Sequence, residues 1–357
     1  MSENSSTTET VDLGKPVAIG KIEKELKQLW KEDDSRTRAS LSNVCIYSEK
    51  KDALEENSVL LNAVTRENAC RGIILSLDTE TQDNVKNAWI KAHCHLQGGK
   101  KEICSEQVAF EIGGGLKGRL RNLVFSHVDS DLPLNFWWRG ELSPRFEERL
   151  YSIIDRFIFD SSEWVNPKQS YKSILAASHE VHPRMILHDL EWTRTYCIRN
   201  SFARLFDHPG TAEKIADIES VEILAEKSHG VAAGLLIAWL ASQAEWEVAS
   251  ADWQSEWKLT FKNNAGKEVQ CTVKFEEGIE PIASFHLGLG DDNHISLTRE
   301  LEAAYLKESV KIDAWNFSQM TPADSDDDAK LVADTLSRSG KNLLFMKILP
   351  TLKAMLS

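Results

Sequence analysis

Hydrophobic and polar residues alternate along the first part of the chain with two distinct periods. Apolar residues at helical spacing predict helices over about Val17 to Lys31, Lys51 to Arg66 and Leu116 to Val128. Short apolar runs predict strands at Val44 to Tyr47 and Gly72 to Leu77. The first two strands and the helix between them form a strand–helix–strand unit, for which right-handed parallel pairing is the default.

Three further strands are predicted at Ala88 to Leu96, Glu102 to Ile112 and Leu132 to Trp138. The turn Gln97-Gly98-Gly99-Lys100 makes the first two of them a hairpin. The remaining elements of this half are a strand and three helices, at Arg156 to Phe159, Pro144 to Leu150, Tyr171 to His179 and Leu190 to Phe206. The loop at Asp207-His208-Pro209-Gly210 is the expected domain boundary.

The rest of the chain repeats these patterns. A strand at Val221 to Leu224 precedes a buried helix at Val231 to Ala244. An antiparallel set then covers Trp257 to Phe261, Val269 to Phe275, Ile282 to Leu287, and Ile295 onward through Tyr305 to Ile312, before helices at Asp326 to Ser337 and Asn342 to Met355. We therefore expect an α/β (α+β) fold of two domains, each a mixed sheet with helices packed on it. The expected divisions are a disordered tail over 1–16 and domains over 17–210 and 211–357.

Charge and composition exclude several classes of protein. The net charge of −13 and pI near 5.3 argue against a nucleic-acid partner, because binding phosphate backbones requires a basic surface. The most apolar stretch, Gly230 to Trp246, is too short to span a bilayer. Six scattered cysteines without a CxxC pair, and an amino terminus without a signal peptide, predict reduced thiols in the cytoplasm.

One unusual stretch runs from Asp129 to Gly140 and contains adjacent tryptophans, Trp137 and Trp138, followed by Arg139. Neighbouring residues of a strand face opposite ways, so one indole would pack on each face of a central strand. Trp and Arg are also enriched at binding hot spots. One indole and Arg139 are therefore alternatively expected to stay accessible to a partner.

A second unusual segment reads Asp189-Leu190-Glu191-Trp192-Thr193-Arg194. If it is helical, its aromatic residues either enter the core or, together with arginines, form a surface that docks a protein. A third segment, Gly113 to Arg119, fits G-x-G-x-x-G between a strand and a helix. Its alternatives are a glycine-rich turn and a phosphate site formed by Gly113, Gly115, Lys117, Gly118 and Arg119.

Catalytic and metal-binding signatures are weak. His93, Cys94, His95 and Cys104 have the residue types of a metal site, but alternation along a strand turns Cys94 away from the two histidines. We expect no metal and no cofactor. No nucleophile elbow or other local catalytic signature is present, which favours a binding or regulatory protein.

Taken together, these motifs resemble the glucose-6-phosphate dehydrogenase assembly protein family, OpcA. The resemblance rests on Asp131-Leu132-Pro133 with Trp137-Trp138-Arg139-Gly140, and on Asp189-Leu190-Glu191-Trp192-Thr193-Arg194. Further matches are Ile22 to Leu26 with Leu29-Trp30, Cys70-Arg71, Ala92 to Leu96, Cys104 to Gln107, and the helix from Gly234 to Trp246. They cover most of the chain from Ile19 onward.

This resemblance implies a non-catalytic partner of glucose-6-phosphate dehydrogenase that promotes its assembly or activity in the oxidative pentose phosphate pathway. It raises the importance of its motif residues, and the candidate partner-contact residues are Asp131, Pro133, Trp137, Trp138, Arg139, Asp189, Trp192, Thr193 and Arg194. Along the strand we expect Pro133 and one indole to be structural, and the other indole and Arg139 to lie near the contact surface. It also implies a link to thioredoxin-dependent redox control, although a disulfide between distant cysteines cannot be predicted from their spacing. The alternative is an enzyme or sensor that binds a sugar phosphate or nucleotide at Gly113 to Arg121.

Overall fold

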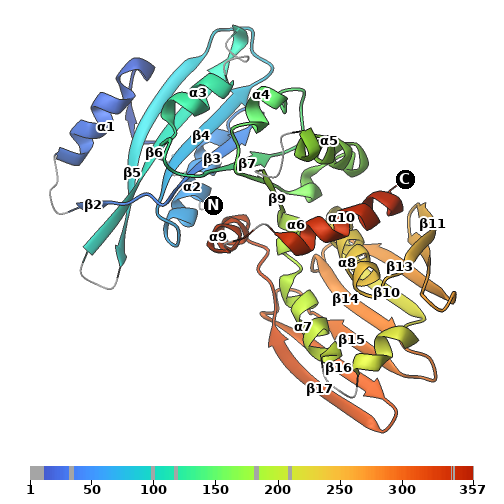
Figure 1. The fold of residues 1–357 in the computed structure, drawn as a ribbon. Helices are drawn as coiled ribbons and strands as arrows, with labels where there is room; N and C mark the ends of the chain where they lie inside the picture. The colour runs from blue at the N-terminus through green and yellow to red at the C-terminus, as the bar shows by residue number, and fades with distance from the viewer. Residues whose placement is uncertain are drawn as a thin grey trace, which may run out of the picture. The chain divides into compact units, whose positions relative to one another are not determined.

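The computed structural model describes residues 12–31, 36–97, 101–115, 120–180, 185–207, 211–338, 340 and 342–356. The chain forms two compact units (Figure 1). Unit 1 comprises Met1–Phe159 and His179–Ile186, and unit 2 comprises Asp160–Ser178 and Leu187–Ser357. Two mixed sheets, of nine and eight strands, carry packed helices, which confirms the expected fold class.

The nine-stranded sheet has the order β1-β5-β6-β4-β3-β7-β8-β9, with β2 paired to β6. Its strands are β1 (Lys15–Pro16), β2 (Arg36–Arg38), β3 (Ser42–Ser48), β4 (Cys70–Asp78), β5 (Lys86–Gln97), β6 (Lys101–Gly113), β7 (Leu134–Arg139), β8 (Arg156–Phe159) and β9 (Ile186–Asp189). The pairs β3–β4, β4–β6, β3–β7 and β7–β8 are parallel, and β5–β6 is an antiparallel hairpin. The predicted parallel unit and hairpin are therefore confirmed.

The helices of unit 1 are η1 (Ile19–Lys21), α1 (Ile22–Lys31), α2 (Ala53–Thr65), α3 (Leu120–His127) and α4 (Glu148–Tyr151). Helix α2 connects β3 to β4 and buries Leu61 and Val64. The helix expected at Pro144 to Leu150 is mostly a turn, and only α4 is helical. Hydrogen bonds from the Arg145 backbone N–H to Ser143 and from the Arg145 guanidinium to Glu49 stabilise that turn.

Unit 2 is built on the eight-stranded sheet, with the order β11-β12-β13-β10-β14-β15-β16-β17. Its strands are β10 (Ser220–Glu226), β11 (Glu247–Trp253), β12 (Trp257–Lys262), β13 (Glu268–Glu276), β14 (Ile282–Gly288), β15 (His294–Thr298), β16 (Tyr305–Ile312) and β17 (Trp315–Pro322). All neighbours are antiparallel except β10 and β13, which are parallel. The predicted antiparallel pairing is confirmed for β12–β13, β14–β15 and β15–β16. Strand β10, which the prediction left outside this set, lies between β13 and β14 and is parallel to β13, because α8 crosses over between β10 and β11.

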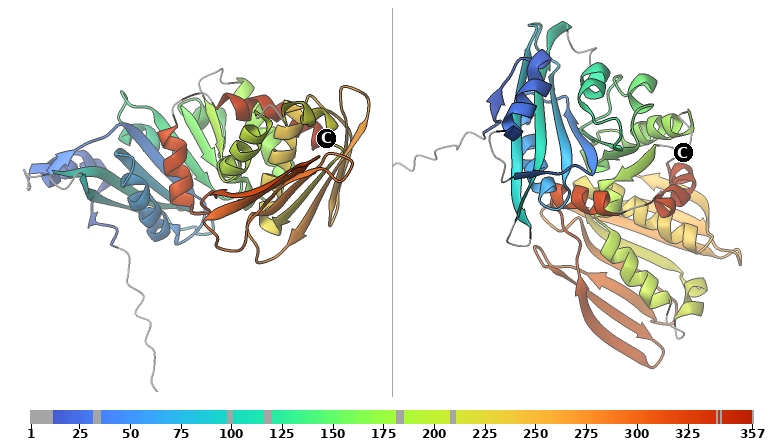
Figure 2. Two further views of the ribbon diagram at one scale, coloured as in Figure 1. Left: turned by 90° about the horizontal axis from the view of Figure 1, so that it is seen from below. Right: turned by 60° about the vertical axis from the view of Figure 1, so that its left-hand side comes forward.

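The remaining helices are η3 (Ser161–Glu163), α5 (Pro167–Glu180), α6 (Leu190–Thr193), α7 (Tyr196–Phe206), η4 (Ala212–Asp217), η5 (Lys227–His229), α8 (Gly230–Gln243), α9 (Asp328–Ser337) and α10 (Leu343–Met355). Figure 2 shows α7, α8 and α10 on one face of the eight-stranded sheet. Helix α8 is buried along most of its length. It lies against β10 and β13, whose buried residues include Ile223 and Val273.

The units divide before the boundary expected at residues 207–210, of which 208–210 lie outside the described residues. Helix α7 belongs to unit 2 because Phe202 packs edge-to-face on Phe285 of β14, with ring centroids 4.6 Å apart. Arg204 of the same helix forms an ion pair with Glu308 of β16 at 2.9 Å. The single helix expected over Leu190 to Phe206 is interrupted at residues 194–195.

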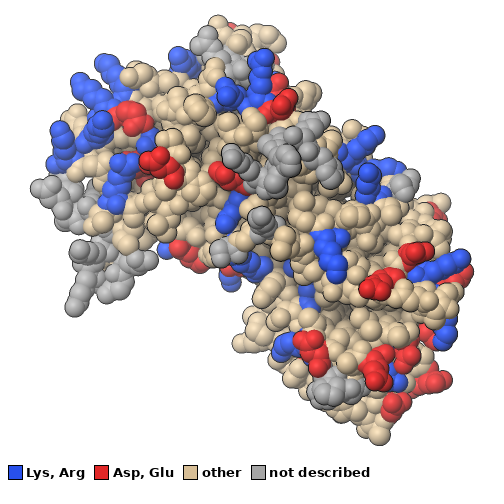
Figure 3. All heavy atoms as spheres, viewed as in Figure 1, with Lys and Arg blue, Asp and Glu red and all other residues tan. Residues whose placement is uncertain are grey.

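On the face shown in Figure 3, basic and acidic side chains are interspersed over both units. Among the described helices, none is long and apolar enough to cross a membrane. Within the same residues no group of three or more His, Cys, Asp and Glu side chains is arranged to hold a metal ion.

Candidate functional site

Strand β7 presents its two tryptophans to the interior of unit 1. It lies between β3 and β8, with Trp137 opposite Ile46 and Ile158. Trp137 is 1% exposed and Trp138 is 0% exposed. Trp138 packs edge-to-face on Tyr47 at 4.5 Å between ring centroids. The central strand is therefore confirmed, and the expected division with one accessible indole is wrong because both faces of the strand are covered.

Arg139 ends β7 and is also held within unit 1. Its Nη1 donates to Asn57 Oδ1 and its Nη2 to Glu56 Oε1, each at 2.7 Å, so the guanidinium is fixed against α2. The guanidinium also lies 5.5 Å from the centre of the Trp137 ring. The Arg139 side chain is only 12% exposed. Of the proposed contact residues in this segment, Asp131 and Pro133 are the two whose side chains are exposed.

In unit 2 the second motif begins with a fully buried carboxylate, that of Asp189. This residue caps α6 by accepting the backbone N–H of Glu191 at 3.0 Å. The same carboxylate accepts hydrogen bonds from the Ser161 hydroxyl at 2.7 Å and from the Tyr171 hydroxyl. Burial and the neighbouring Asp160 charge raise the pKa of Asp189 to about 7. Asp189 thus joins η3, α5 and α6.

Arg194 and Glu191 form the centre of a buried charge cluster. Arg194 pairs with Glu191, with Asp160 at 3.1 Å and with Asp326 at 2.5 Å. Glu191, which is 0% exposed, also accepts a hydrogen bond from His229 Nδ1 at 2.8 Å and one from the Ala232 backbone N–H at 3.1 Å. Burial lowers the pKa of His229, but the hydrogen bond and charge of Glu191 outweigh burial and raise it.

Trp192 and Thr193 complete the motif on the inner side of α6. The Thr193 hydroxyl lies 3.2 Å from that of Thr335 on α9. The guanidinium of Arg199 lies 3.4 Å from the centre of the Trp192 ring. Trp192 and Arg199 line a cavity of about 500 Å³, and burial lowers the pKa of Arg199 to about 9.

The structure therefore gives most of the nine predicted contact residues an internal role. Asp189, Trp192, Thr193 and Arg194 are each at most 6% exposed. The hydrogen bonds and ion pairs around Asp189, Glu191 and Arg194 could not be predicted from the sequence, because their other partners lie at the distant positions 160, 171, 229 and 326. One local signal was available: Asp189 followed by Glu191 is the pattern of a helix N-cap.

The glycine-rich segment is described only in part. Gly113 ends β6 and Gly114 and Gly115 follow it, whereas Leu116, Lys117, Gly118 and Arg119 lie outside the described residues. Gly114 has a φ of +62°, and a Cβ there would lie 2.3 Å from the carbonyl oxygen of Asp83. The described glycines thus pack closely against the loop that precedes β5, as in the expectation of a glycine-rich turn.

Cys94 and Cys104 form a disulfide across the β5–β6 hairpin. The antiparallel register places them directly opposite each other, with their Cα atoms 4.0 Å apart. The expectation of reduced thiols is therefore wrong for these two residues, and neither is available to a metal. This pairing could have been predicted from the expected hairpin, because a turn centred on Gly99 places positions 94 and 104 opposite each other.

Two family models match the chain in succession, and both describe a glucose-6-phosphate dehydrogenase subunit. Residues 61–176 match the model of its N-terminal domain, and residues 185–349 match the model of its C-terminal domain. These two segments cover most of the chain, and residues 160–176 match the first model but belong to unit 2.

Curated relatives agree with the family models. A "Putative OxPP cycle protein OpcA" from Synechocystis sp. is 27% identical over 205 residues, which are 56% of this chain and 42% of that protein. A protein of the same name from Synechococcus elongatus is 24% identical over 247 residues, which are 68% of this chain and 55% of that protein. The matched region thus spans about half the length of these relatives.

Among solved structures, the fold is similar to that of KijD10, a 3-ketoreductase from Actinomadura kijaniata. The open conformation matches with a TM-score of 0.51 and 13% identity, over 88% of this chain and 95% of the reductase. At this identity the likeness describes the fold alone. The two family models are what assign the sequence: this chain belongs to the glucose-6-phosphate dehydrogenase assembly protein family, OpcA.

Proposed function

We propose that this protein is a non-catalytic factor that binds glucose-6-phosphate dehydrogenase and favours its assembled, active form in the oxidative pentose phosphate pathway. The observation that carries the proposal is the match of both family models, each named for a subunit of that dehydrogenase, in order along the chain. The relatives named for the oxidative pentose phosphate cycle support it.

A non-catalytic role is supported by the first strand–helix connection of unit 1. In folds that bind nicotinamide dinucleotides, this turn carries G-x-G-x-x-G, which lets the backbone approach the pyrophosphate. Here the turn between β3 and α2 reads Glu49-Lys50-Lys51-Asp52. This turn contains no glycine, so it lacks the residues that allow the backbone to approach a pyrophosphate closely, and it does not fit a dinucleotide bound in that way.

The proposed activation requires differential binding. A factor shifts the equilibrium of the dehydrogenase toward an active assembly only if it binds that form more tightly than the inactive one. A tenfold shift in the assembly equilibrium needs a difference of about 1.4 kcal/mol between the two binding free energies. A few well-placed surface residues suffice for an effect of that size.

The test is a titration of the cognate dehydrogenase with the purified protein, following specific activity, the apparent affinity for glucose 6-phosphate and the assembly state by size-exclusion chromatography with light scattering. We expect co-elution, a larger assembled fraction and higher activity at subsaturating substrate. Absence of both co-elution and any kinetic change would refute the proposal. Parallel titrations in oxidising and reducing buffer measure whether the Cys94–Cys104 disulfide affects the interaction.

Asp131 is the exposed motif residue best suited to test partner contact, and we propose that it lies at the interface. Asp131→Ala should weaken dehydrogenase binding by about fivefold, the effect of removing one moderately strong interface interaction. Its melting temperature should stay unchanged, because the side chain is exposed. Asp83→Ala removes the same charge from an exposed position of another loop and is the matched control. Equal binding by both variants would remove Asp131 from the interface.

A further inference from the structure

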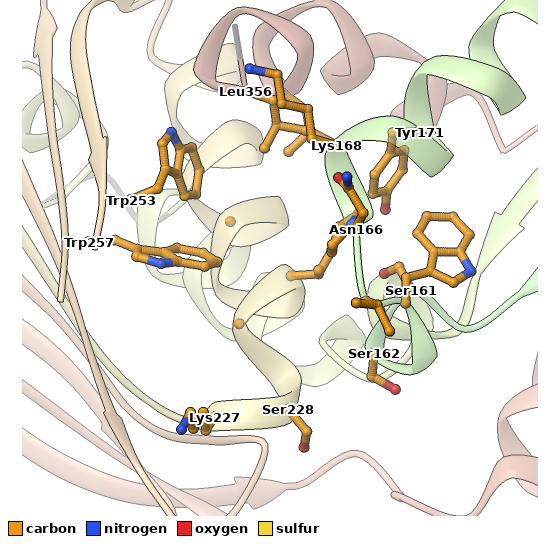
Figure 4. A pocket seen from close by; sticks show the side chains of 17 residues that line it. Ser161, Ser162, Asn166, Lys168, Tyr171, Lys227, Ser228, Trp253, Trp257 and Leu356 are labelled. Atoms are coloured by element: carbon orange, nitrogen blue, oxygen red, sulfur yellow. The ribbon is translucent and has the colours of Figure 1, made fainter. Parts of the chain in front are cut away.

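Two of the cavities in the described part of unit 2 have similar volumes, about 540 and about 500 Å³, which are in the range of small-molecule sites. Figure 4 shows the larger one, in which the indoles of Trp253 and Trp257 lie across from Tyr171. The Tyr171 hydroxyl already donates to Asp189, and the two lysines that line this cavity are exposed. The smaller cavity differs from it, because one of its lining residues is a buried cation.

The lining of the smaller cavity is mostly apolar and includes four aromatic side chains, those of Trp192, Tyr196, Phe206 and Trp239. They come from α6, α7 and α8, and the first turn of α10 adds Leu344. Tyr196 and Leu344 are 43% and 42% exposed, although both side chains are large and mainly apolar. The cavity is therefore open to solvent, and a ligand with an apolar ring would cover surface that the fold leaves exposed.

Arg199 of α7 is the buried cation of this cavity and is only 5% exposed. Its Nη1 donates to the carbonyl oxygen of Trp192 at 2.7 Å and to the Thr195 hydroxyl, and these bonds hold the break between α6 and α7. Nε and Nη2, which carry three of the five N–H donors of a guanidinium, donate to no group among the described residues. The role of Arg199 in the fold therefore leaves most of its donors unused, on a residue that lines a cavity.

Among the described residues no carboxylate forms an ion pair with Arg199, whereas the equally buried Arg194 pairs with several. Asp324 attracts the guanidinium of Arg199, but the Asp324 carboxylate accepts the backbone N–H of Cys197 at 2.7 Å. Burial outweighs this attraction and lowers the pKa of Arg199 to about 9, so the side chain is still charged at neutral pH. A buried charge without a direct partner is costly, and a bound anion would offset that cost.

The other charges of the lining indicate which anion fits. Arg338 and Asp207 are both exposed, and the Arg338 guanidinium lies 4.1 Å from the centre of the Tyr196 ring. Among the described lining residues, two guanidinium charges and one carboxylate charge give a net charge of +1. A single carboxylate matches this charge, whereas a phosphate ester carries about two negative charges at neutral pH.

We propose that this cavity binds a small carboxylate that carries an apolar ring, with the carboxylate at Arg199 and the ring among Tyr196, Phe206 and Trp239. The planar fork of a guanidinium matches the geometry of a carboxylate, and aromatic side chains offer a ring a large contact area. All residues of the described lining belong to unit 2. The inference therefore does not depend on binding of the dehydrogenase.

The test measures the affinity of the purified full-length chain by isothermal titration calorimetry. The probes are benzoate and 1-naphthoate, the neutral amide of each, acetate and inorganic phosphate. We expect at least one ring carboxylate to bind about tenfold or more tightly than its amide, acetate and phosphate, because it alone joins a ring to a single negative charge. Failure of both ring carboxylates to bind would overturn the proposal. So would equal affinity for the amides, which describes an apolar cavity, or for phosphate, which describes an unselective anion site.

The first matched variants change the charge of the lining. Replacement of Arg199 itself would also disturb the break between α6 and α7, so the change is made at the exposed Arg338. Arg338→Glu should weaken binding of the ring carboxylate by about fivefold or more, because it replaces an attraction by a repulsion. Lys330→Glu makes the same charge change at an exposed position of α9 that does not line the cavity. An equal loss in both variants would show that the carboxylate is not bound in this cavity.

The second matched variants change the space in the cavity. Ala203 is an exposed residue of α7 that lines it, so Ala203→Phe should leave the melting temperature nearly unchanged and place a ring where the ligand binds. We expect affinity for the ring carboxylate to fall by about tenfold or more. Ala354→Phe makes the same change at an exposed position of α10 outside the lining and should bind as the parent does. Unchanged affinity of the Ala203→Phe variant would place the ligand elsewhere and overturn the proposal.

Discussion

Arg139 illustrates how a residue that is typical of interfaces can instead be used inside a fold. Its guanidinium joins the end of β7 to α2 through Asn57 and Glu56 and lies over Trp137. Asn57 is 0% exposed and uses its amide to donate to Ser48. Its carbonyl oxygen therefore depends on Arg139 for a hydrogen bond within a site that water reaches poorly.

Replacement of Arg139 by Ala should lower the free energy of unfolding by about 1–3 kcal/mol, because a buried acceptor loses its donor. Arg139→Lys should recover part of this loss, since one ammonium cannot reach both partners with the geometry of a guanidinium. Urea denaturation followed by tryptophan fluorescence measures both variants. An Ala variant as stable as the parent protein would contradict the structural role and restore Arg139 as a candidate contact residue.

At the scale of elements, long periodic segments were predictable and short or interrupted ones were not. The hairpin, the β3–α2–β4 unit and α8 follow directly from hydrophobic periodicity. Strands β9, β11 and β17 were missed, and each lies at an edge of its sheet; β11 and β17 also have mostly exposed side chains and so lack an apolar run. The break between α6 and α7 depends on side-chain bonds of Thr195, which accepts from Arg199 and donates to the carbonyl oxygen of Trp192. Such local side-chain bonds leave no periodic signal.

Helix α8 contains two glycines whose surroundings differ. A Cβ at Gly234 would have one neighbour, an atom of the Trp257 ring at 3.7 Å, whereas a Cβ at Gly230 would approach the same ring to 2.9 Å. Gly234→Ala should therefore stabilise the protein by about 0.5–1 kcal/mol through helix propensity. Gly230→Ala should lower the melting temperature because the indole must move. Differential scanning calorimetry measures the melting temperatures of both variants. Equal shifts for the two variants would show that Trp257 does not pack against Gly230.

The β5–β6 hairpin carries the second element-scale prediction. Alkylation of the denatured, unreduced protein should label four cysteines, Cys45, Cys70, Cys197 and Cys271, and leave Cys94 and Cys104 unlabelled until reductant is added. Reduction should lower the free energy of unfolding by about 2.7 kcal/mol, the scale expected for a loop closed over ten residues. Cys94→Ala should remove the effect of reductant. Six labelled cysteines in freshly purified, unreduced protein would contradict the disulfide.

At the scale of the whole molecule, buried titratable groups of unit 2 contribute to how stability depends on pH. His229 has a raised pKa, so its stabilising contribution is complete below its usual value of 6.5 and is lost as the pH rises through the raised value. Burial raises the pKa of Asp189 to about 7 and that of Asp324 to about 6. Both carboxyl groups therefore also lower the stability of the fold as the pH rises, since the folded protein retains protons that the unfolded chain has released.

These three groups make the free energy of unfolding fall as the pH rises from about 5.5 to 8.5, whereas burial lowers the pKa of His93, His95, His127 and His286, which acts in the opposite direction. In His229→Gln, which keeps a donor for Glu191 but does not titrate, the decline should be shallower. The stability difference between parent and variant should shrink toward high pH, as measured by urea denaturation across this range. A difference that is constant with pH would show that His229 is not protonated in the fold.

Unit 1 is not one continuous stretch of chain, because residues 160–178 of unit 2 are inserted before its last segment, His179–Ile186. During synthesis, unit 1 therefore cannot acquire all of its residues until the ribosome has passed position 186, by which point part of unit 2 has already emerged. The interleaving of the two units along the chain also affects the design of fragments. A cut between residues 176 and 185, where one family model ends and the next begins, would leave each fragment with residues missing from its unit. The full chain is thus the smallest piece of this sequence in which both units have all of their residues.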